Sequence, residues 1–174
     1  VHGDVIFATV HIVGVTGQEG GIDIHNAVTE AAVAWVDSVF AKAESMNARG
    51  VFIATQADIY PITSEPYLLG LFCPKCPKVR PFYETVHEAL LQQTRRYRKP
   101  VVLAVGDTHI FRVDKPLYDG EHLVEHFTRV ETFGEGQVHW VRVMVDPASR
   151  EVFSFHQEII AENVGVGWSE SDRE

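Results

Sequence analysis

Three short, almost continuously apolar runs set the strongest limit on how this chain can fold. They are VIFATVHIV (residues 5–13), VFIAT (residues 51–55) and VVLAV (residues 101–105). Such runs are typical of strands that are covered on both faces, as in a parallel sheet. Parallel strands need a long crossover between them, and the intervening segments have helical periodicity. The first two-thirds of the chain therefore predicts alternating strands and helices, with a mostly parallel sheet and flanking helices.

The two predicted helices have recognisable boundaries. The first carries apolar residues at helical spacing through residues 27–40, and either Asp23 or Asn26 can cap its start. The second is expected to open at Pro81, because proline suits the first position of a helix. It is expected to run to Tyr97.

The last third of the chain has a different pattern. HIFRV, FTRVETF, HWVRVMV and VFSFH alternate between apolar and polar residues, with turn sequences DG, GEG and DPAS between them. This pattern is typical of antiparallel strands with one face in water. The predicted fold class is therefore α/β: a mostly parallel sheet with flanking helices, followed by antiparallel strands. We expect one domain over residues 1–160 and a flexible acidic tail over residues 161–174.

Length and charge narrow the class of protein. A chain of 174 residues suits a single domain. Its formal net charge of −9 argues against a nucleic-acid partner, which requires a basic face. The basic run TRRYRK (residues 94–99) falls at a predicted helix end, where cations complement the helix dipole. No apolar run reaches the ~20 residues of a membrane span. Because the sequence begins almost inside a strand, we expect it to be a processed chain or a piece of a longer protein.

Polar side chains follow two of the predicted parallel strands. Gln56 and Asp58 follow the second strand, and Asp107 and His109 follow the third. Ligands of α/β sheets bind outside the carboxyl ends of the strands, so these four residues are candidate ligands of a divalent manganese, iron or zinc ion. The alternatives are structural: Asp107 can form an Asx-turn after the preceding glycine, and His109 can point into the core. His11, in the first strand, is expected to be packed.

The two cysteines, Cys73 and Cys76, form a single CxxC pair in a proline-rich segment. With His87 and another histidine the pair can complete a zinc site. It can also be a redox pair before a helix. The third reading is a local disulfide or two free thiols in a loop. A CxxC pair fits both reducing and oxidising compartments, so localisation stays open.

Other catalytic patterns are absent from the sequence. There is no G-x-S-x-G elbow, P-loop or G-x-G-x-x-G. Glu131, Glu135 and His139 lie in segments with surface-like alternation, and we expect them to be solvated.

The order of these segments resembles the C-terminal half of a calcineurin-like metallophosphoesterase over about residues 5–160. VIFATVHIVG resembles the strand after the family's Gly-Asn-His motif, and NAVTEAAVAWVDSVFAKA resembles a helix of that fold. GVFIATQADIY resembles the strand that ends in the family's lone ligand histidine. VVLAVGDTHIF resembles the strand that ends in Gly-His-x-His, and WVRVMVDPASREVFSF resembles the closing hairpin.

The resemblance implies metal-binding roles but also shows departures. His109 matches the second histidine of Gly-His-x-His, a metal ligand, whereas Asp107 stands in place of the first. Gln56 stands where the family has its lone ligand histidine, and a neutral amide is a poor ligand. The family's Asp-x-His, Gly-Asp-x-x-Asp and Gly-Asn-His motifs lie N-terminal to the segments matched here, and none of them precedes Val5 in this sequence.

Two functions follow as expectations from the resemblance. The first is a metal-dependent phosphoesterase, acting on a small phosphomonoester or phosphodiester, or the C-terminal portion of one. The second is a non-catalytic phosphoesterase-like module that acts through oligomerisation or a partner protein. A missing N-terminal half would also leave strand edges uncovered, which favours self-association or pairing with that half.

Overall fold

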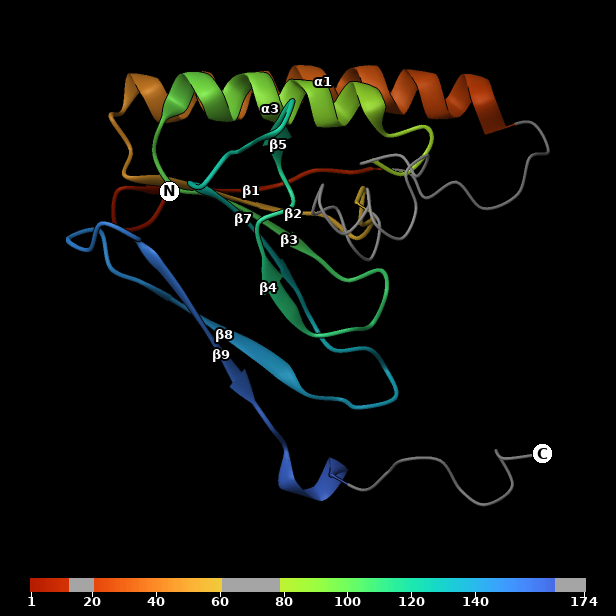
Figure 1. The fold of residues 1–174 in the computed structure, drawn as a ribbon, viewed down its shortest axis with the longest axis vertical. Coiled ribbons are helices and arrows are strands. Elements are labelled where there is room, and N and C mark those ends of the chain that lie inside the picture. Colours follow the sequence, from red (N-terminus) through yellow and green to blue (C-terminus); the bar gives the residue numbers. More distant parts are fainter. Residues whose placement is uncertain (13–20, 61–78, 165–174) are drawn as a thin grey trace.

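The computed structural model describes residues 1–12, 21–60 and 79–164 (Figure 1). Its centre is a five-stranded sheet with the spatial order β1-β2-β3-β7-β4. The first four of these strands are parallel to their neighbours, and β4 runs antiparallel to β7. The strands of this sheet are β1 (Val5–Thr9), β2 (Gly50–Ala54), β3 (Val101–Val105), β4 (Arg112–Asp114) and β7 (Phe127–Glu131).

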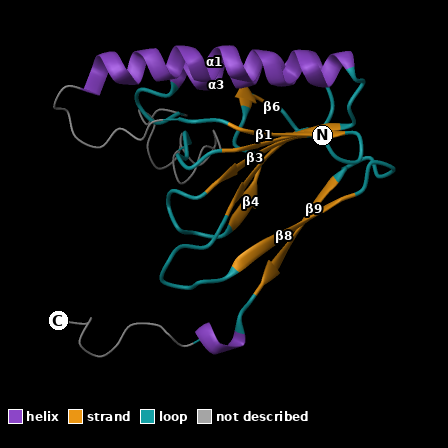
Figure 2. Ribbon diagram, turned by 180° about the vertical axis from the view of Figure 1, so that it is seen from behind, coloured by secondary structure: helices purple, strands orange, loops and turns teal. Residues whose placement is uncertain are grey.

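Two helices cover one face of the sheet, α1 (Gly21–Ser45) and α3 (Glu84–Tyr97). They lie side by side across the strands in both views (Figures 1 and 2). Their apolar stripes and the helix-facing side chains of the strands form the larger core. Its fully buried members include Val36, Phe40, Ile53, Leu90, Leu103 and Phe127. Of the helices in the described residues, none is long and apolar enough to cross a membrane.

A hairpin of β8 (Trp140–Val145) and β9 (Phe153–Glu158) covers part of the opposite face (Figure 1). A second, smaller core lies between it and the sheet. Val5, Val102 and Val130 on the sheet pack with Phe153 of the hairpin. Side chains of β8 alternate between half-buried and exposed, as a hairpin with one wet face requires. The molecule therefore has three layers: helices, sheet and hairpin.

The remaining elements are short. A two-stranded ribbon pairs β5 (Tyr118–Asp119) with β6 (His122–Leu123). The 3-10 helix η1 (Ala161–Asn163) follows the hairpin and includes the first residues of the segment expected to be a flexible tail. Residues 165–174 of that segment lie outside the described part of the chain, as do Cys73 and Cys76.

The predicted fold class is confirmed at the level of a mixed α/β chain with a mostly parallel sheet, flanking helices and antiparallel strands. Element boundaries differ in places. The second helix begins at Glu84 rather than Pro81, because Phe82 adopts a φ of 74° that no helix accommodates. Its end at Tyr97 is as predicted, and Arg98 closes it in the left-handed conformation.

The role of FTRVE (Phe127–Glu131) differs most from the sequence prediction. It was expected to be an antiparallel strand with one wet face. It pairs in parallel with β3 as well as antiparallel with β4, so it lies inside the main sheet. Four of its five residues are buried, among them Arg129 and Glu131. The alternation of polar and apolar residues here reflects buried charge rather than a face in water.

The first strand differs in the opposite way. Its apolar sequence predicted a strand over residues 5–13 that is covered on both faces. β1 ends at Thr9 and is an edge strand of the described sheet, and only its start is covered on both faces, with Val5 in the smaller core and Ile6 in the larger one. Phe7 contacts Phe52 with ring centroids 5.6 Å apart and remains 41% exposed. The hairpin therefore leaves an apolar side chain uncovered at this edge.

Candidate functional site

The carboxyl ends of β2, β3 and β7 meet at one edge of the sheet, and polar residues gather there. Gln56 and Asp58 follow β2, and Asp107 follows β3. The Gln56 amide nitrogen lies 3.2 Å from Asp107 Oδ1. The Asp58 backbone nitrogen lies 3.3 Å from Asp107 Oδ2. Three of the four candidate ligands therefore do come together, as expected from the parallel order of the strands.

Asp107 is held by donors on both carboxylate oxygens. Besides Gln56 and the Asp58 amide, Arg80 donates from Nη1 to Oδ2 at 2.6 Å, and the same nitrogen donates to the Asp58 carbonyl at 2.8 Å. Partial burial alone would raise the pKa of Asp107. The hydrogen bonds from Arg80, Asp58 and Gln56, with the charge of Arg80, outweigh it and lower the pKa. Asp107 is thus a stable anion rather than only a turn residue.

Asp58 is fully buried and receives two guanidinium groups. Arg129 Nη1 lies 2.8 Å and Arg112 Nη2 2.9 Å from its Oδ2, and the Tyr60 amide donates to its Oδ1 at 3.1 Å. Burial raises the pKa of Asp58, while the charge of Arg129 and the hydrogen bonds oppose that rise. Both oxygens of this candidate ligand therefore already have donors from within the protein.

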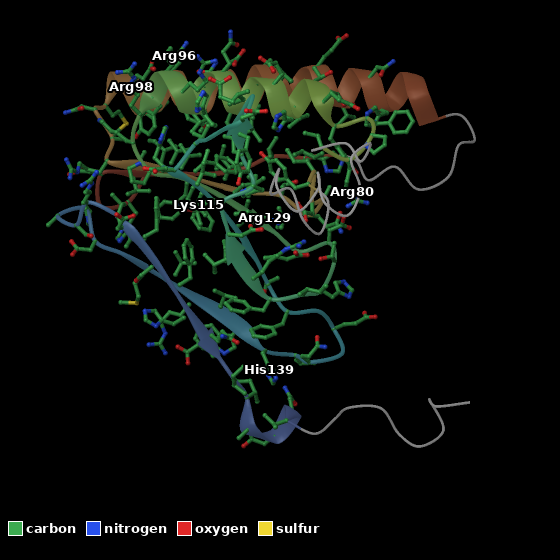
Figure 3. The ribbon with its side chains drawn as sticks, in the orientation of Figure 1. Arg80, Arg96, Arg98, Lys115, Arg129 and His139 are labelled. Carbon is green, nitrogen blue, oxygen red and sulfur yellow. The ribbon has the colours of Figure 1, made fainter. Side chains whose placement is uncertain are left out.

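Arg129 lies at the centre of the network and has no exposed surface (Figure 3). It makes a bidentate contact with the Asp114 carboxylate through Nε and Nη2, and its guanidinium lies 5.6 Å from the Tyr60 ring centroid. Burial alone would lower the pKa of Arg129, but Asp114 and Asp58 outweigh that effect and raise it. The guanidinium is therefore a fixed buried charge with two carboxylate partners.

Glu131 ties the turn after β3 to this network. Its Oε1 accepts from the Thr108 amide at 2.6 Å and the Thr108 hydroxyl at 2.7 Å. Its Oε2 lies 2.6 Å from Arg112 Nη2. Glu131 is 0% exposed, so the expectation that it is solvated is wrong. It is buried because β7 is a central strand, and a buried carboxylate needs such partners.

His109 does not join the residues around Asp107. It is exposed, with a left-handed φ of 61°, so it is not packed into the core either. Its side chain lies against Gly134, where an added Cβ would come within 2.2 Å of His109 Cβ. Only a glycine at 134 leaves room for this arrangement. His11 is also exposed and lies beyond the end of β1, so the expectation that it is packed is wrong.

The residues at this edge do not fit a metal ion as they are arranged. Within residues 1–12, 21–60 and 79–164, no three His, Cys, Asp or Glu side chains are grouped so that they could hold one. The lone pairs of Asp58 and Asp107 that a metal would need are directed at arginine, backbone and amide donors. The zinc or disulfide prediction for Cys73 and Cys76 falls outside the described residues.

Cross-strand register explains how the charged residues pair. In the antiparallel β4–β7 ladder, Arg112 is opposite Glu131 and Asp114 is opposite Arg129. RVD on β4 and RVE on β7 thus place opposite charges across from each other twice. Sequence reasoning missed the roles of Arg112, Asp114 and Arg129 because it treated both segments as strands with one face in water. The matching R-x-D and R-x-E patterns were the signal that could have revealed it.

Water reaches only part of the network. The side chains of Arg80 and Asp107 are 40% and 26% exposed, whereas Asp58, Glu131 and Arg129 are completely buried. The buried part fixes three strand ends relative to one another. Asp114, with a side chain that is 37% exposed, is also accessible, and Arg80 with Asp107 is the accessible ion pair at the carboxyl edge.

Comparisons with models of known protein families, with curated proteins and with solved structures found no match to this chain.

Proposed function

We propose that this chain is a non-catalytic, phosphoesterase-like module that acts through self-association or a partner protein. The observation that carries the proposal is the use of arginines at the carboxyl ends of the strands. Asp58 and Asp107, which are candidate metal ligands by their positions after β2 and β3, both take hydrogen bonds from guanidinium groups. A divalent cation and an arginine compete for the same lone pairs, so this arrangement favours a structural role for the two carboxylates.

The uncovered edge of the sheet supports the second part of the proposal. Among the described residues, β1 has a neighbouring strand on one side only, and it forms the edge of the sheet farther from β4. Exposed edge strands offer unpaired backbone groups to another chain. Phe7, 41% exposed, adds apolar area at that edge. Pairing of β1 with a further strand would satisfy both the backbone and this side chain.

A metal-dependent phosphoesterase is the second candidate. It is favoured by the convergence of Gln56, Asp58 and Asp107 at the edge where α/β sheets bind ligands. Asp107 would have to exchange Arg80 for a metal ion, and further ligands would have to come from outside the described residues. Hydrolysis of a small phosphomonoester or phosphodiester is the activity that this candidate predicts.

One experiment separates the two candidates. The purified chain is analysed for bound metal and assayed with p-nitrophenyl phosphate and bis-p-nitrophenyl phosphate in added manganese. The proposal expects no stoichiometric metal and no turnover above that of the buffer without protein, both for the chain and for Glu30→Gln, an exposed control on α1. Metal-dependent turnover that disappears in Asp107→Asn would overturn the proposal in favour of the hydrolase.

Self-association is tested separately by sedimentation over a range of chain concentrations. We expect a concentration-dependent dimer or larger species, weakened by Phe7→Ser because that change removes apolar area from the β1 edge. Val164→Ser is the matched control, since Val164 is 64% exposed and lies far along the chain in the segment after η1. Loss of association in the control but not in Phe7→Ser would exclude the β1 edge as the contact.

A further inference from the structure

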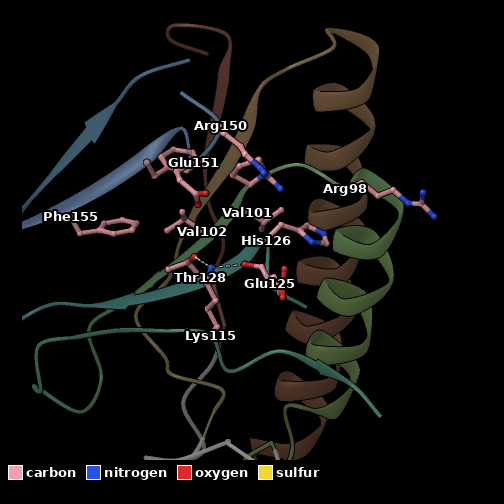
Figure 4. Close-up of a pocket in the computed structure, with 12 residues that line it drawn as sticks. Arg98, Val101, Val102, Lys115, Glu125, His126, Thr128, Arg150, Glu151 and Phe155 are labelled. Atoms are coloured by element: carbon pink, nitrogen blue, oxygen red, sulfur yellow. Dashed lines mark hydrogen bonds between the residues drawn. The ribbon is translucent and has the colours of Figure 1, made fainter. Parts of the chain in front are cut away.

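A pocket opens at the end of the sheet opposite the Asp107 edge (Figure 4). It lies among the N-terminal residues of β3 and β7, the end of α3 and the turn of the β8–β9 hairpin. Its volume is about 340 Å³, which falls within the range of small-molecule sites. No residue of the Asp107 network lines it, so this pocket is separate from the function proposed above.

The inner wall of the pocket is apolar. Val102 of β3 and Phe153 of β9 are both buried, and Phe155 lies beside them half-buried. In Figure 4 the Phe155 ring and the Val102 side chain both border the open space. A ligand with a small apolar body can therefore be in contact with carbon on this side.

Cationic side chains lie next to the apolar wall of the pocket. Lys115 Nζ donates to the Glu125 carbonyl at 2.5 Å and to the Thr128 hydroxyl at 3.0 Å. An ammonium group has three protons, so these two contacts fix its position and leave one proton for a ligand. Arg150 extends from the hairpin turn over the pocket in Figure 4. Within the described residues, the Arg150 guanidinium makes no hydrogen bond or ion pair.

Two carboxylates in the lining of the pocket limit the negative charge that a bound ligand can carry. Glu125 and Glu151 line it together with the cations Lys115, Arg98 and Arg150. In Figure 4 the guanidinium of Arg98 points away from the pocket, which leaves Lys115 and Arg150 as the facing cations. The balance is close to neutral in a chain whose formal net charge is −9. A polyanion would be repelled by the glutamates, whereas a monoanion can pair with Lys115 and Arg150.

We propose that this pocket binds a small organic monoanion, with its carboxylate group on Lys115 and Arg150 and its apolar body against Val102 and Phe155. The proposal joins two independent features of the same cavity. One is a cation held in place by two protein acceptors, and the other is an arginine that has no hydrogen-bond or ion-pair partner in the described part of the chain. Because exposed ion pairs are individually weak, the apolar contact is needed for measurable affinity.

The test is a titration of the ¹⁵N-labelled chain followed by amide chemical shifts. Benzoate is the probe, with acetate and benzyl alcohol as probes for the anionic group and the ring alone, and with phenyl phosphate as a more highly charged analogue. We expect saturable shifts around Val102, Thr128 and Phe155 with benzoate, and weaker ones with either single-feature probe. Phenyl phosphate, which is largely dianionic at neutral pH, should bind less tightly than benzoate; tighter binding would overturn the preference for a monoanion.

Variants distinguish this pocket from the rest of the surface. Arg150→Gln and Lys115→Gln should each weaken benzoate binding about fivefold, the loss expected for one exposed charge contact. Arg142→Gln, which removes an exposed arginine on β8, should leave it unchanged. Arg150 makes no hydrogen bond or ion pair with another described residue, so the Arg150→Gln variant remains informative if Lys115→Gln unfolds. The proposal is overturned if no probe gives saturable shifts, if Arg150→Gln binds as the parent does, or if the shifts cluster at Arg80 and Asp107.

Discussion

The two ends of the parallel sheet use arginine and lysine in opposite ways. At the carboxyl end, Arg129 is completely buried and has two carboxylate partners. At the amino end, Arg150 is exposed and has no partner among the described residues. Burial makes the difference, because a charge removed from water must be matched by the protein itself, whereas an exposed charge remains available to a solute. The buried charges at the carboxyl end therefore hold the strands in place, whereas Arg150 at the amino end is accessible to a ligand.

The largest expected effect tests whether the buried end holds the strands together. Arg129→Met leaves Asp58 buried with only Arg112 as a charged partner and removes the pair with Asp114. Breaking a buried pair in this way costs about 3–5 kcal/mol of unfolding free energy. Urea denaturation monitored by circular dichroism measures the loss.

Arg142→Met is the matched control for that variant. Arg142 pairs with Glu158 at 2.7 Å, but its side chain is 52% exposed. An exposed pair contributes about 0–1 kcal/mol. Equal losses in the two variants would mean that burial does not distinguish the two ends of the sheet.

A smaller effect is expected at Glu131, which connects the turn after β3 to the network. Glu131→Gln weakens the pair with Arg112 and replaces a charged acceptor of the Thr108 bonds by a neutral one. We expect a loss of about 1–3 kcal/mol and faster hydrogen exchange at the Thr108 amide. Glu135→Gln, at an exposed position in the following turn, should change neither. Unchanged exchange at Thr108 in Glu131→Gln would show that the carboxylate does not hold the turn.

The sequence was sufficient to predict those elements whose limits are set by residues close to them in the chain. Val101–Val105 is an apolar run bounded by proline and glycine, so its limits are encoded locally. The end of α3 at Tyr97 is local too, because Pro100 is close behind it. The convergence of Gln56, Asp58 and Asp107 followed from the parallel order alone.

What could not be predicted depends on contacts distant in sequence. Whether Arg129 and Glu131 are buried is decided by the pairing of β7 with both β3 and β4. Without knowledge of that pairing, the pattern of FTRVE indicates a surface strand. Likewise, His109 lies away from Asp107 because its φ is 61° and its side chain fits against Gly134, a residue 25 positions later. A turn conformation of this kind has no signature in the residues of GDTH themselves.

The smallest expected effect concerns Asp107, a partly exposed residue beside the buried network. We expect its contribution to the free energy of unfolding to depend on pH in the acid range. Although partial burial opposes the shift, hydrogen bonds from Arg80, Asp58 and Gln56 lower the folded-state pKa of Asp107 below its unfolded value, so the folded chain keeps the carboxylate charged where the unfolded chain protonates it. The stabilisation from Asp107 is therefore fully present above about pH 4, near the unfolded value, and is lost as the pH falls through the folded pKa.

Asp107→Asn should accordingly destabilise the chain by about 1 kcal/mol at pH 7, as expected for a partly exposed pair, and by less at pH 3. Urea denaturation of both proteins at the two pH values gives the difference. Glu30→Gln, which is exposed on α1, should show a small difference that does not change with pH. If the difference in unfolding free energy between Asp107→Asn and the parent increases toward pH 3, Arg80 does not stabilise the charged form of Asp107. Asp107 would then belong with the exposed, unmatched charges of the opposite end rather than with the buried network.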